Sequence, residues 1–486
     1  MTPNRFDVAV LGAGIGGLTA AFHLASGGAR VLVVEAAARV GGVIESRALD
    51  SAVGRFRFEA GPNTVLDGRP AVGELLAAAG LAGERVEARP AAERRYVWKR
   101  GRLLALPTGA GSFLATPLFS AAAKLRLAAE PFIGRPAESA GEETVAGFVR
   151  RRLGGEFLRY AVGPFVSGVY AGDPERLSMR WAVPRLHALE AEHGGLLRGM
   201  LARGRRARRA RRVGVGAAAR RGGGGPAGPG GAMFTFADGL EELPRRLAER
   251  VAGHDGCAVR TGVRAGGLRA EEGGYAIATS AGELRARRAV VALPSAATAE
   301  LLAAATGGAS RVLAEVPWAP VAVVHLGVRL ADLAHPLDGF GFLAPRGEGL
   351  RLLGCLFTST IFPGKAPAGC AALAVFLGGR TDPAAVELAD DAMREVVCED
   401  LGRALGLAGE PVVAEVLRWP RAIPQYEVGH GRYLALAEEI EQRLPGVVLA
   451  GSYRGGVSVP ERIEAGAAAA TATAILAHHP NPRSLA

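Results

Sequence analysis

A glycine-rich turn near the start of the chain is the first group of residues whose spacing could do chemistry. It consists of Gly12-Ala13-Gly14-Ile15-Gly16-Gly17, between an apolar segment at 6–11 and an amphipathic one at 15–27. The first glycine permits a tight turn, the second lets a diphosphate approach the backbone, and the last allows a helix to pack closely on a strand. Free N–H groups at the helix N-terminus can then bind the phosphates. This turn predicts a dinucleotide site.

An acidic residue supports this interpretation. Glu35 ends the next apolar segment, residues 29–35, and follows Gly17 by 18 positions. A carboxylate at that distance can accept hydrogen bonds from ribose hydroxyls. The elements that must position these groups are therefore a strand, a helix and a second strand, which together form a βαβ opening.

Other kinds of catalytic group are not indicated. The histidines that could act as bases are scattered and have no triad or ligand partner in the sequence. The four cysteines lie far apart and include no C-x-x-C pair, so we expect a reduced protein with no cysteine-based metal site. These residues are His187, His193, His325, His430, Cys257, Cys355, Cys370 and Cys398.

Length and composition fit a globular protein of two or three domains. The chain has 486 residues, of which 49% are hydrophobic and 22% charged, and a domain typically takes about 100–200 residues. We find no run of about 18 apolar residues that would span a membrane and no signal-peptide layout. A cytoplasmic location is therefore expected.

The formal net charge of +11 is concentrated in one segment. Nine arginines and no acid lie between Arg203 and Arg221, and a glycine-rich run follows. Because low-complexity segments of this kind cannot bury a core, we predict a disordered Arg/Gly-rich insertion over 201–231. No aromatic residue interrupts it, which argues against a single-strand stacking platform, and we expect no nucleic-acid partner.

The nucleotide pattern extends into Arg39-Val40-Gly41-Gly42. With Glu35 and the glycine turn, this spacing is similar to the FAD-binding fingerprint of the flavin amine-oxidase superfamily, including its trailing R-x-G-G. The extension favours FAD over a nicotinamide cofactor. Glu59-Ala60-Gly61-Pro62-Asn63 is then similar to the segment that passes the flavin ring in such proteins.

Further blocks narrow the resemblance. From about residue 6 to residue 470, outside the Arg/Gly insertion, the chain resembles the oxygen-dependent protoporphyrinogen oxidases of this superfamily. The blocks that carry it are Arg94–Pro107, Ser167–Met179, Gly339–Leu343, Leu353–Pro363, Arg418–Tyr426 and Gly455–Pro460. One block departs from the pattern, because an acid and a small residue commonly precede the isoleucine, whereas here Glu461-Arg462 precede Ile463.

The resemblance implies a fold of mixed α/β and α+β class. It would contain a Rossmann-like FAD-binding domain of the flavin amine-oxidase type, a β-rich substrate domain and a helical membrane-associating subdomain. The implied boundaries are 1–87, 232–300 and 420–478 for the discontinuous FAD domain, 88–108 and 301–419 for the substrate domain, and 109–200 for the helical subdomain.

The resemblance also implies the site. The chemistry is carried by the flavin N5, and no side chain is expected to be catalytic. The implied FAD-binding residues are Gly12, Gly14, Ile15, Gly16, Gly17, Glu35, Ala36, Arg39, Gly42, Gly61, Pro62, Asn63, Val263, Trp419, Val457, Ser458 and Val459. The implied substrate residues are Arg95, which would pair with a propionate, and Gly168, Leu343, Leu356 and Phe376, which would line an apolar slot.

The implied activity is the six-electron oxidation of protoporphyrinogen IX to protoporphyrin IX in haem biosynthesis. Oxygen would be the acceptor and hydrogen peroxide a product. The implied partners are the porphyrinogen, oxygen, the inner face of the cell membrane as a peripheral docking surface, and a ferrochelatase downstream.

Three alternatives stay open. Oxidation of coproporphyrinogen III uses the same bridge chemistry but needs a roomier, more cationic pocket. A generic amine oxidase is disfavoured because none of the three lysines, Lys99, Lys124 and Lys365, is obviously placed beside flavin N5. The non-enzymatic alternative is a flavin-fold module that binds nucleic acid through its basic segment at 201–231.

Overall fold

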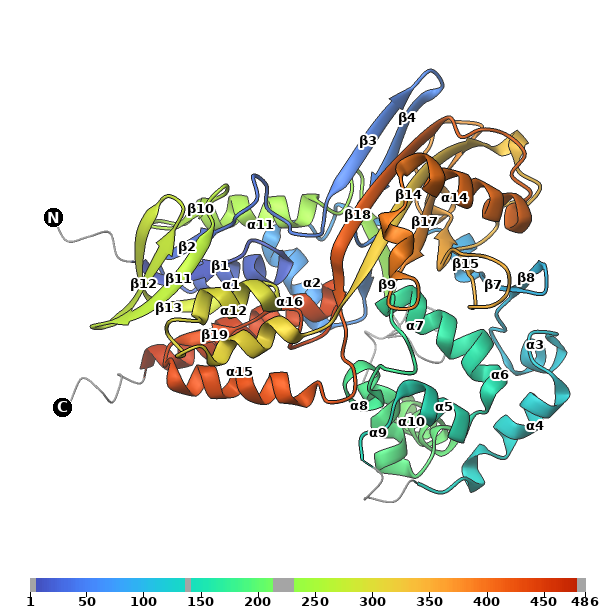
Figure 1. Cartoon of the computed structure of the whole chain (residues 1–486), viewed down its shortest axis with the longest axis horizontal. Helices are drawn as coiled ribbons and strands as arrows, with labels where there is room; N and C mark the ends of the chain where they lie inside the picture. Colours follow the sequence, from blue (N-terminus) through green and yellow to red (C-terminus); the bar gives the residue numbers. More distant parts are fainter. Residues whose placement is uncertain (1–5, 136–140, 213–230, 479–486) are drawn as a thin grey trace.

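A computed structural model describes residues 6–135, 141–212 and 231–478. The molecule has two main sheets in separate lobes, with a cluster of helices packed below the second one (Figure 1). The expected combination of a Rossmann-like domain, a β-rich domain and a helical region is confirmed.

The first sheet builds the nucleotide lobe. Its centre is parallel, because β1 pairs with β2 on one side and with β13 on the other, and β11–β13 continue it as an antiparallel meander. The strand order is β10-β2-β1-β13-β12-β11, with β19 also pairing β13. Its strands are β1 (Phe6–Leu11), β2 (Val31–Val34), β10 (Ala258–Arg260), β11 (Ala265–Glu271), β12 (Gly274–Thr279), β13 (Gly282–Val291) and β19 (Val447–Leu449).

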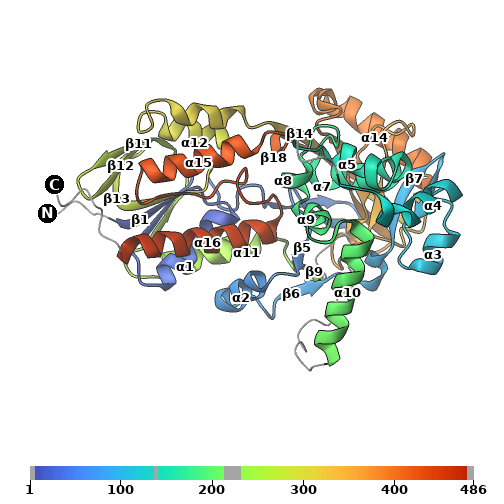
Figure 2. The ribbon, with the colours of Figure 1, turned by 90° about the horizontal axis from the view of Figure 1, so that it is seen from below.

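Helices cover this sheet on both faces, as an α/β lobe requires. Helix α16 lies beside α1, so the last helix of the chain packs on the first (Figure 2). The helices of this lobe are α1 (Ile15–Ser26), α2 (Pro70–Ala79), α11 (Glu242–Ala252), α12 (Ser295–Leu302), α15 (Gly431–Arg443) and α16 (Val459–His478).

The second sheet has the order β18-β14-β17-β16-β15-β7-β8. Helix α14 (Asp390–Leu405) packs on one face, while α13 (Thr358–Ile361) follows β16. Strand β18 runs across the predicted boundary at 419/420. The strands are β7 (Arg95–Lys99), β8 (Arg102–Ala105), β14 (Trp318–Arg329), β15 (Gly341–Leu343), β16 (Gly354–Leu356), β17 (Cys370–Gly378) and β18 (Val413–Pro424).

Two small sheets lie between the lobes. The hairpin β3–β4 leads into the segment at 60–63, and a three-stranded sheet has the order β5-β9-β6. Their strands are β3 (Ser46–Ser51), β4 (Gly54–Glu59), β5 (Val65–Asp67), β6 (Arg85–Glu87) and β9 (Ala232–Phe236).

The helical region forms its own apolar core around Phe119, Phe148 and Phe157. None of the helices in the described ranges is long and apolar enough to cross a membrane. The helices are α3 (Ala110–Ala115), α4 (Ala121–Ala128), α5 (Val145–Arg152), α6 (Gly155–Phe157), α7 (Gly163–Tyr170), α8 (Met179–Ala182), α9 (Pro184–His193) and α10 (Leu196–Arg212).

Helix α10 corrects one prediction. The disordered insertion expected over 201–231 was wrong for residues 201–212, which continue this helix as it projects from the body of the molecule (Figure 2). Alanine and arginine are strong helix formers, and the buried carboxylate of Glu130 accepts the Leu196 and Leu197 backbone N–H groups at the helix start, at 2.8 and 3.0 Å. The remainder of the predicted insertion, 213–230, lies outside the described residues.

Candidate cofactor and substrate site

The glycine turn has the geometry of a phosphate cradle. Gly12 has φ +102°, and a Cβ there would lie 2.8 Å from the Ala292 carbonyl oxygen. A Cβ on Gly17 would lie 2.0 Å from the Gly12 carbonyl oxygen, so these two positions require glycine. At Gly14, by contrast, no atom lies within 4 Å of the Cβ position, which leaves open space over the start of α1 for a diphosphate.

Glu35 is held at the end of β2 by backbone donors. Its Oε2 accepts the Ala13 N–H and its Oε1 accepts the Ala37 N–H, both at 2.8 Å. Each oxygen keeps a second lone pair, so the carboxylate can still accept a ribose hydroxyl. The Val263 N–H donates to the Glu35 carbonyl at 2.8 Å, which places Val263 beside it, and Ala36 follows it as an exposed residue.

The Arg39 side chain braces its own loop. Its guanidinium donates to the carbonyls of Gly42 at 2.7 Å and Ile44 at 2.9 Å, and it pairs with Glu45 at 2.8 Å. In this loop Gly41 and Gly42 have positive φ, +103° and +60°, which glycine adopts readily. Arg39 therefore braces the loop in which Gly41 pairs with Gly14 of the first turn.

The segment at 60–63 joins the two lobes. A Cβ on Gly61 would lie 2.0 Å from the Val43 carbonyl oxygen, so the chain passes there only as glycine. The Trp419 indole on β18 donates to the Ala60 carbonyl at 2.8 Å. Next to Pro62, the Asn63 Oδ1 is buried with no hydrogen-bond partner among the described residues. A bound cofactor can satisfy such an atom, so the segment fits a flavin.

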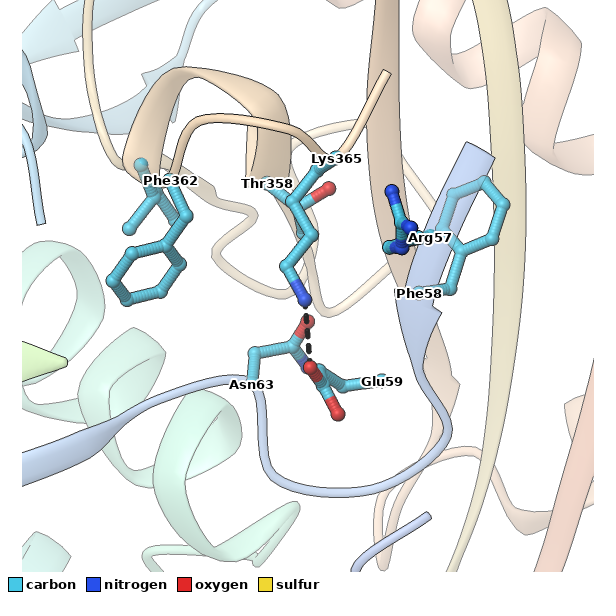
Figure 3. Close-up of a pocket in the computed structure, with 8 residues that line it drawn as sticks. Arg57, Phe58, Glu59, Asn63, Thr358, Phe362 and Lys365 are labelled. Carbon is cyan, nitrogen blue, oxygen red and sulfur yellow. Dashed lines mark hydrogen bonds and ion pairs between the residues drawn. The ribbon is translucent and has the colours of Figure 1, made fainter. Parts of the chain in front are cut away.

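A buried ion pair lies in the same small pocket as Asn63 of this segment. In a small pocket, Lys365 points toward Glu59 and Asn63 (Figure 3), and its Nζ lies 2.7 Å from Glu59 Oε1. Burial raises the pKa of the Glu59 carboxyl, and the Lys365 ammonium and the Ser46 hydroxyl oppose that rise. The pair ties the second lobe to the strand that leads into the flavin-passing segment.

The loop before α16 is built from its own backbone and two side chains. The Glu461 carboxylate accepts the N–H groups of Val457 and Ser458 at 3.2 and 3.1 Å. The Gly456 N–H donates to the Tyr426 hydroxyl at 3.0 Å. Val459 is the first residue of α16, so the predicted contact residues lie at a helix N-terminus, where negative charge is stabilised.

The predicted apolar substrate residues lie on one face of the second sheet. Leu356 on β16, Phe376 on β17 and Trp419 on β18 pack into one cluster and are all only partly buried. Leu343 on β15 faces helix α7, where a Cβ on Gly168 would lie 2.7 Å from its Cδ2. The structure thus brings Leu356, Phe376 and Trp419 together in one apolar wall, while Leu343 contacts Gly168 on α7.

Arg95 lies at the edge of this wall. It pairs with Gly341 in the β7–β15 register, next to Leu343. Its guanidinium lies 5.2 Å from the ring centre of Phe340, and the described part of the chain offers it no carboxylate within ion-pair distance. Its neighbour Arg94 instead pairs with Asp338. Arg95 is therefore available for an external carboxylate.

Two of the histidines, His325 and His430, are buried and have lowered pKa values. His325 is fully buried in β14 against Phe58, and burial lowers its pKa to about 3. His430 Nε2 lies 2.8 Å from the Tyr453 carbonyl oxygen, and burial lowers its pKa.

Sequence reasoning missed the Glu59–Lys365 pair and the loop-holding role of Tyr426. Glu59 and Lys365 are 306 positions apart, so no local spacing signals their contact. The one available signal was the rarity of lysine in a chain whose other cations are arginines.

Comparison with known proteins gives the chain relatives along its length. Residues 15–474 match the family model described as flavin containing amine oxidoreductase. Over 481 residues the chain is 30% identical to protoporphyrinogen oxidase 2, chloroplastic/mitochondrial, of Arabidopsis thaliana, covering 95% of this chain and 92% of the relative. Over 485 residues it is 29% identical to coproporphyrinogen III oxidase of Bacillus subtilis, covering 96% and 98%.

The fold has a close counterpart among solved structures. A protein of Exiguobacterium, solved under a provisional assignment as a protoporphyrinogen oxidase, superimposes with a TM-score of 0.76 at 22% identity, covering 98% of this chain and 99% of that one. The architecture described above is therefore that of a known fold.

Proposed function

Because the chain belongs to the flavin-containing amine oxidoreductase family, we propose that it oxidises a porphyrinogen to the corresponding porphyrin. It is an oxidoreductase and its cofactor is FAD. When bound, FAD supplies hydride acceptance at N5 and passes the electrons to oxygen. Three rounds remove six electrons and yield three molecules of hydrogen peroxide.

The observation that carries this proposal is the wall formed by Leu356, Phe376 and Trp419. A porphyrinogen is a large apolar macrocycle, and a partly exposed apolar face on a rigid sheet is the surface it needs. Trp419 also hydrogen bonds to the flavin-passing segment at Ala60, so one residue links the substrate wall to the cofactor side. Catalysis then rests on the orientation of the porphyrinogen against the cofactor.

Protoporphyrinogen IX is the substrate we favour. Arg95 is a cation free to bind one propionate at the edge of the wall, and a guanidinium matches a carboxylate well. Coproporphyrinogen III carries two more propionates and is the second candidate, favoured by the similarity to the Bacillus subtilis enzyme over nearly its whole length.

One experiment separates these two substrates. Purified protein loaded with FAD is mixed with each reduced tetrapyrrole in air, and porphyrin fluorescence and oxygen consumption are followed. We expect protoporphyrinogen to give the larger kcat/KM, with three oxygen molecules consumed for each porphyrin formed. A larger value for coproporphyrinogen would reverse the substrate assignment, and no oxidation of either compound would contradict the proposed function.

We further propose peripheral association with the inner face of the cell membrane. Three apolar side chains of the helical region are strongly exposed: Leu114, Leu125 and Phe132, at 70%, 72% and 86%. Strongly exposed apolar side chains are candidates for contact with lipid, and these three come from consecutive segments of the chain, α3, α4 and the turn after α4. The hydrophobic porphyrin would then pass along the membrane to a ferrochelatase. Co-sedimentation with vesicles, compared with a variant carrying Ser at all three positions, tests the association.

A further inference from the structure

Arg462 lies in the first turn of α16 and is only 8% exposed. Its Nη1 donates to the carbonyls of Gly451 at 3.3 Å and Gly456 at 3.5 Å, and its Nη2 donates to the carbonyl of Ala450. A Cβ on Gly16 would lie only 3.2 Å from Nη2. The guanidinium therefore lies directly against the glycine turn.

This cation forms no ion pair within the described part of the chain. Among the described residues, no carboxylate lies within ion-pair distance of the Arg462 guanidinium, since the neighbouring Glu461 turns to the loop N–H groups and to Arg69. Burial lowers the pKa of Arg462. A buried charge whose partners are only carbonyls carries a large desolvation cost.

Its place in the fold makes this cost larger. Arg462 belongs to the first turn of α16, and Gly16 belongs to the first turn of α1. Both helix N-termini bear partial positive charge, which disfavours a cation and favours an anion at the same spot. The guanidinium thus lies beside two helix N-termini, where a bound anion would be stabilised.

We propose that Arg462 is a cofactor-binding residue whose guanidinium provides fixed positive charge to the diphosphate of FAD at the glycine turn. The three carbonyl contacts hold the side chain in place beside the turn and join it to the loop at 450–456. The inference rests on the FAD cofactor and not on the identity of the substrate, so it is tested without any tetrapyrrole.

The test measures the affinity of the full-length, flavin-stripped chain for FAD, ADP and riboflavin. Arg462→Met keeps the length of the side chain but removes the charge, and Arg462→Lys keeps the charge. Arg454→Met is the matched control, because Arg454 also donates to a carbonyl near this loop but is already paired with Glu441.

A charge-assisted contact of about 1.5–3 kcal/mol corresponds to about 10- to 100-fold in Kd. We therefore expect Arg462→Met to raise the Kd for FAD and for ADP by that factor and to leave the Kd for riboflavin unchanged. The dependence of FAD affinity on salt should also become smaller. Arg462→Lys should retain most of the affinity and Arg454→Met all of it. An unchanged FAD Kd, or an equal loss for riboflavin and FAD, would overturn the proposal.

Should Arg462→Met fail to fold, as judged by circular dichroism, the lysine variant decides the question. A preserved preference for ADP over riboflavin and a preserved salt dependence support the role of the charge. Loss of both in a folded lysine variant contradicts it.

Discussion

The Nζ of Lys365 lies 2.7 Å from Oε1 of Glu59, and the two side chains are 4% and 3% exposed. Glu59 is the last residue of β4, directly before the segment at 60–63, and it also accepts the Ser46 hydroxyl at 2.6 Å. A buried charge pair therefore contributes to the contact between the lobes at the flavin-passing segment, beside the Trp419–Ala60 hydrogen bond.

Lys365→Met should destabilise the fold in a pH-dependent way. Removing one partner of a buried ion pair costs about 3–5 kcal/mol, because the remaining charge is uncompensated. Burial already raises the pKa of Glu59, so without Lys365 the folded state binds a proton that the unfolded state releases. Stability then falls as pH rises above the ordinary carboxyl range. We expect the melting temperature of Lys365→Met to lie further below that of the parent protein at pH 8 than at pH 5.

The double variant Glu59→Gln/Lys365→Met is the control for this charge effect. It removes both members of the ion pair, so its melting temperature should exceed that of Lys365→Met at pH 8 and should change little with pH relative to the parent. A deficit in Lys365→Met that does not depend on pH would show that packing, not charge, is lost.

Arg95→Ala should raise the KM for the porphyrinogen. A lost charge-assisted hydrogen bond of about 1.5–3 kcal/mol corresponds to about 10- to 100-fold in KM, with little change in kcat. Arg94→Ala is the control, since Arg94 is an exposed residue already paired with Asp338, and such surface pairs contribute about 0–1 kcal/mol. Steady-state kinetics on both variants check this prediction. Equal KM values for the two variants would show that Arg95 does not bind the substrate.

Gly168→Ala should narrow the substrate wall without harming the fold. The new methyl group would lie 2.7 Å from Leu343 Cδ2, so the leucine end must move. The displaced leucine end takes up space at the substrate face, so we expect the porphyrinogen KM to rise about fivefold, which corresponds to about 1 kcal/mol of binding, while FAD affinity is kept. Gly155→Ala on α6, where no atom lies within 4 Å of the new carbon, should behave as the parent. An unchanged KM in Gly168→Ala would place the substrate elsewhere.

The parts of the site that sequence could predict are those whose chemistry depends on local spacing. The glycine turn and Glu35 belong to one βαβ unit, so their positions follow from strand and helix length. Leu343, Leu356 and Phe376 came only from family resemblance, because alternating apolar residues look alike in every half-buried strand. The part of helix α10 at 201–212 was missed because composition was weighed above the helix propensity of alanine and arginine. Contacts such as Glu59–Lys365 depend on how the two lobes pack together, and a local stretch of sequence cannot predict that packing.

Replacing the nine arginines between Arg203 and Arg221 by Gln should leave turnover intact. Glutamine is also a strong helix former, so the described part of α10 can be kept. We expect unchanged kcat/KM and FAD content, because the oxidation depends on the cofactor and the apolar wall. Retention on DNA should fall and lose its salt dependence, since that attraction comes from cations that displace counterions. The parent protein, assayed at 50 and 200 mM salt, is the reference for both measurements. Loss of turnover together with DNA retention would favour the nucleic-acid module over the enzyme.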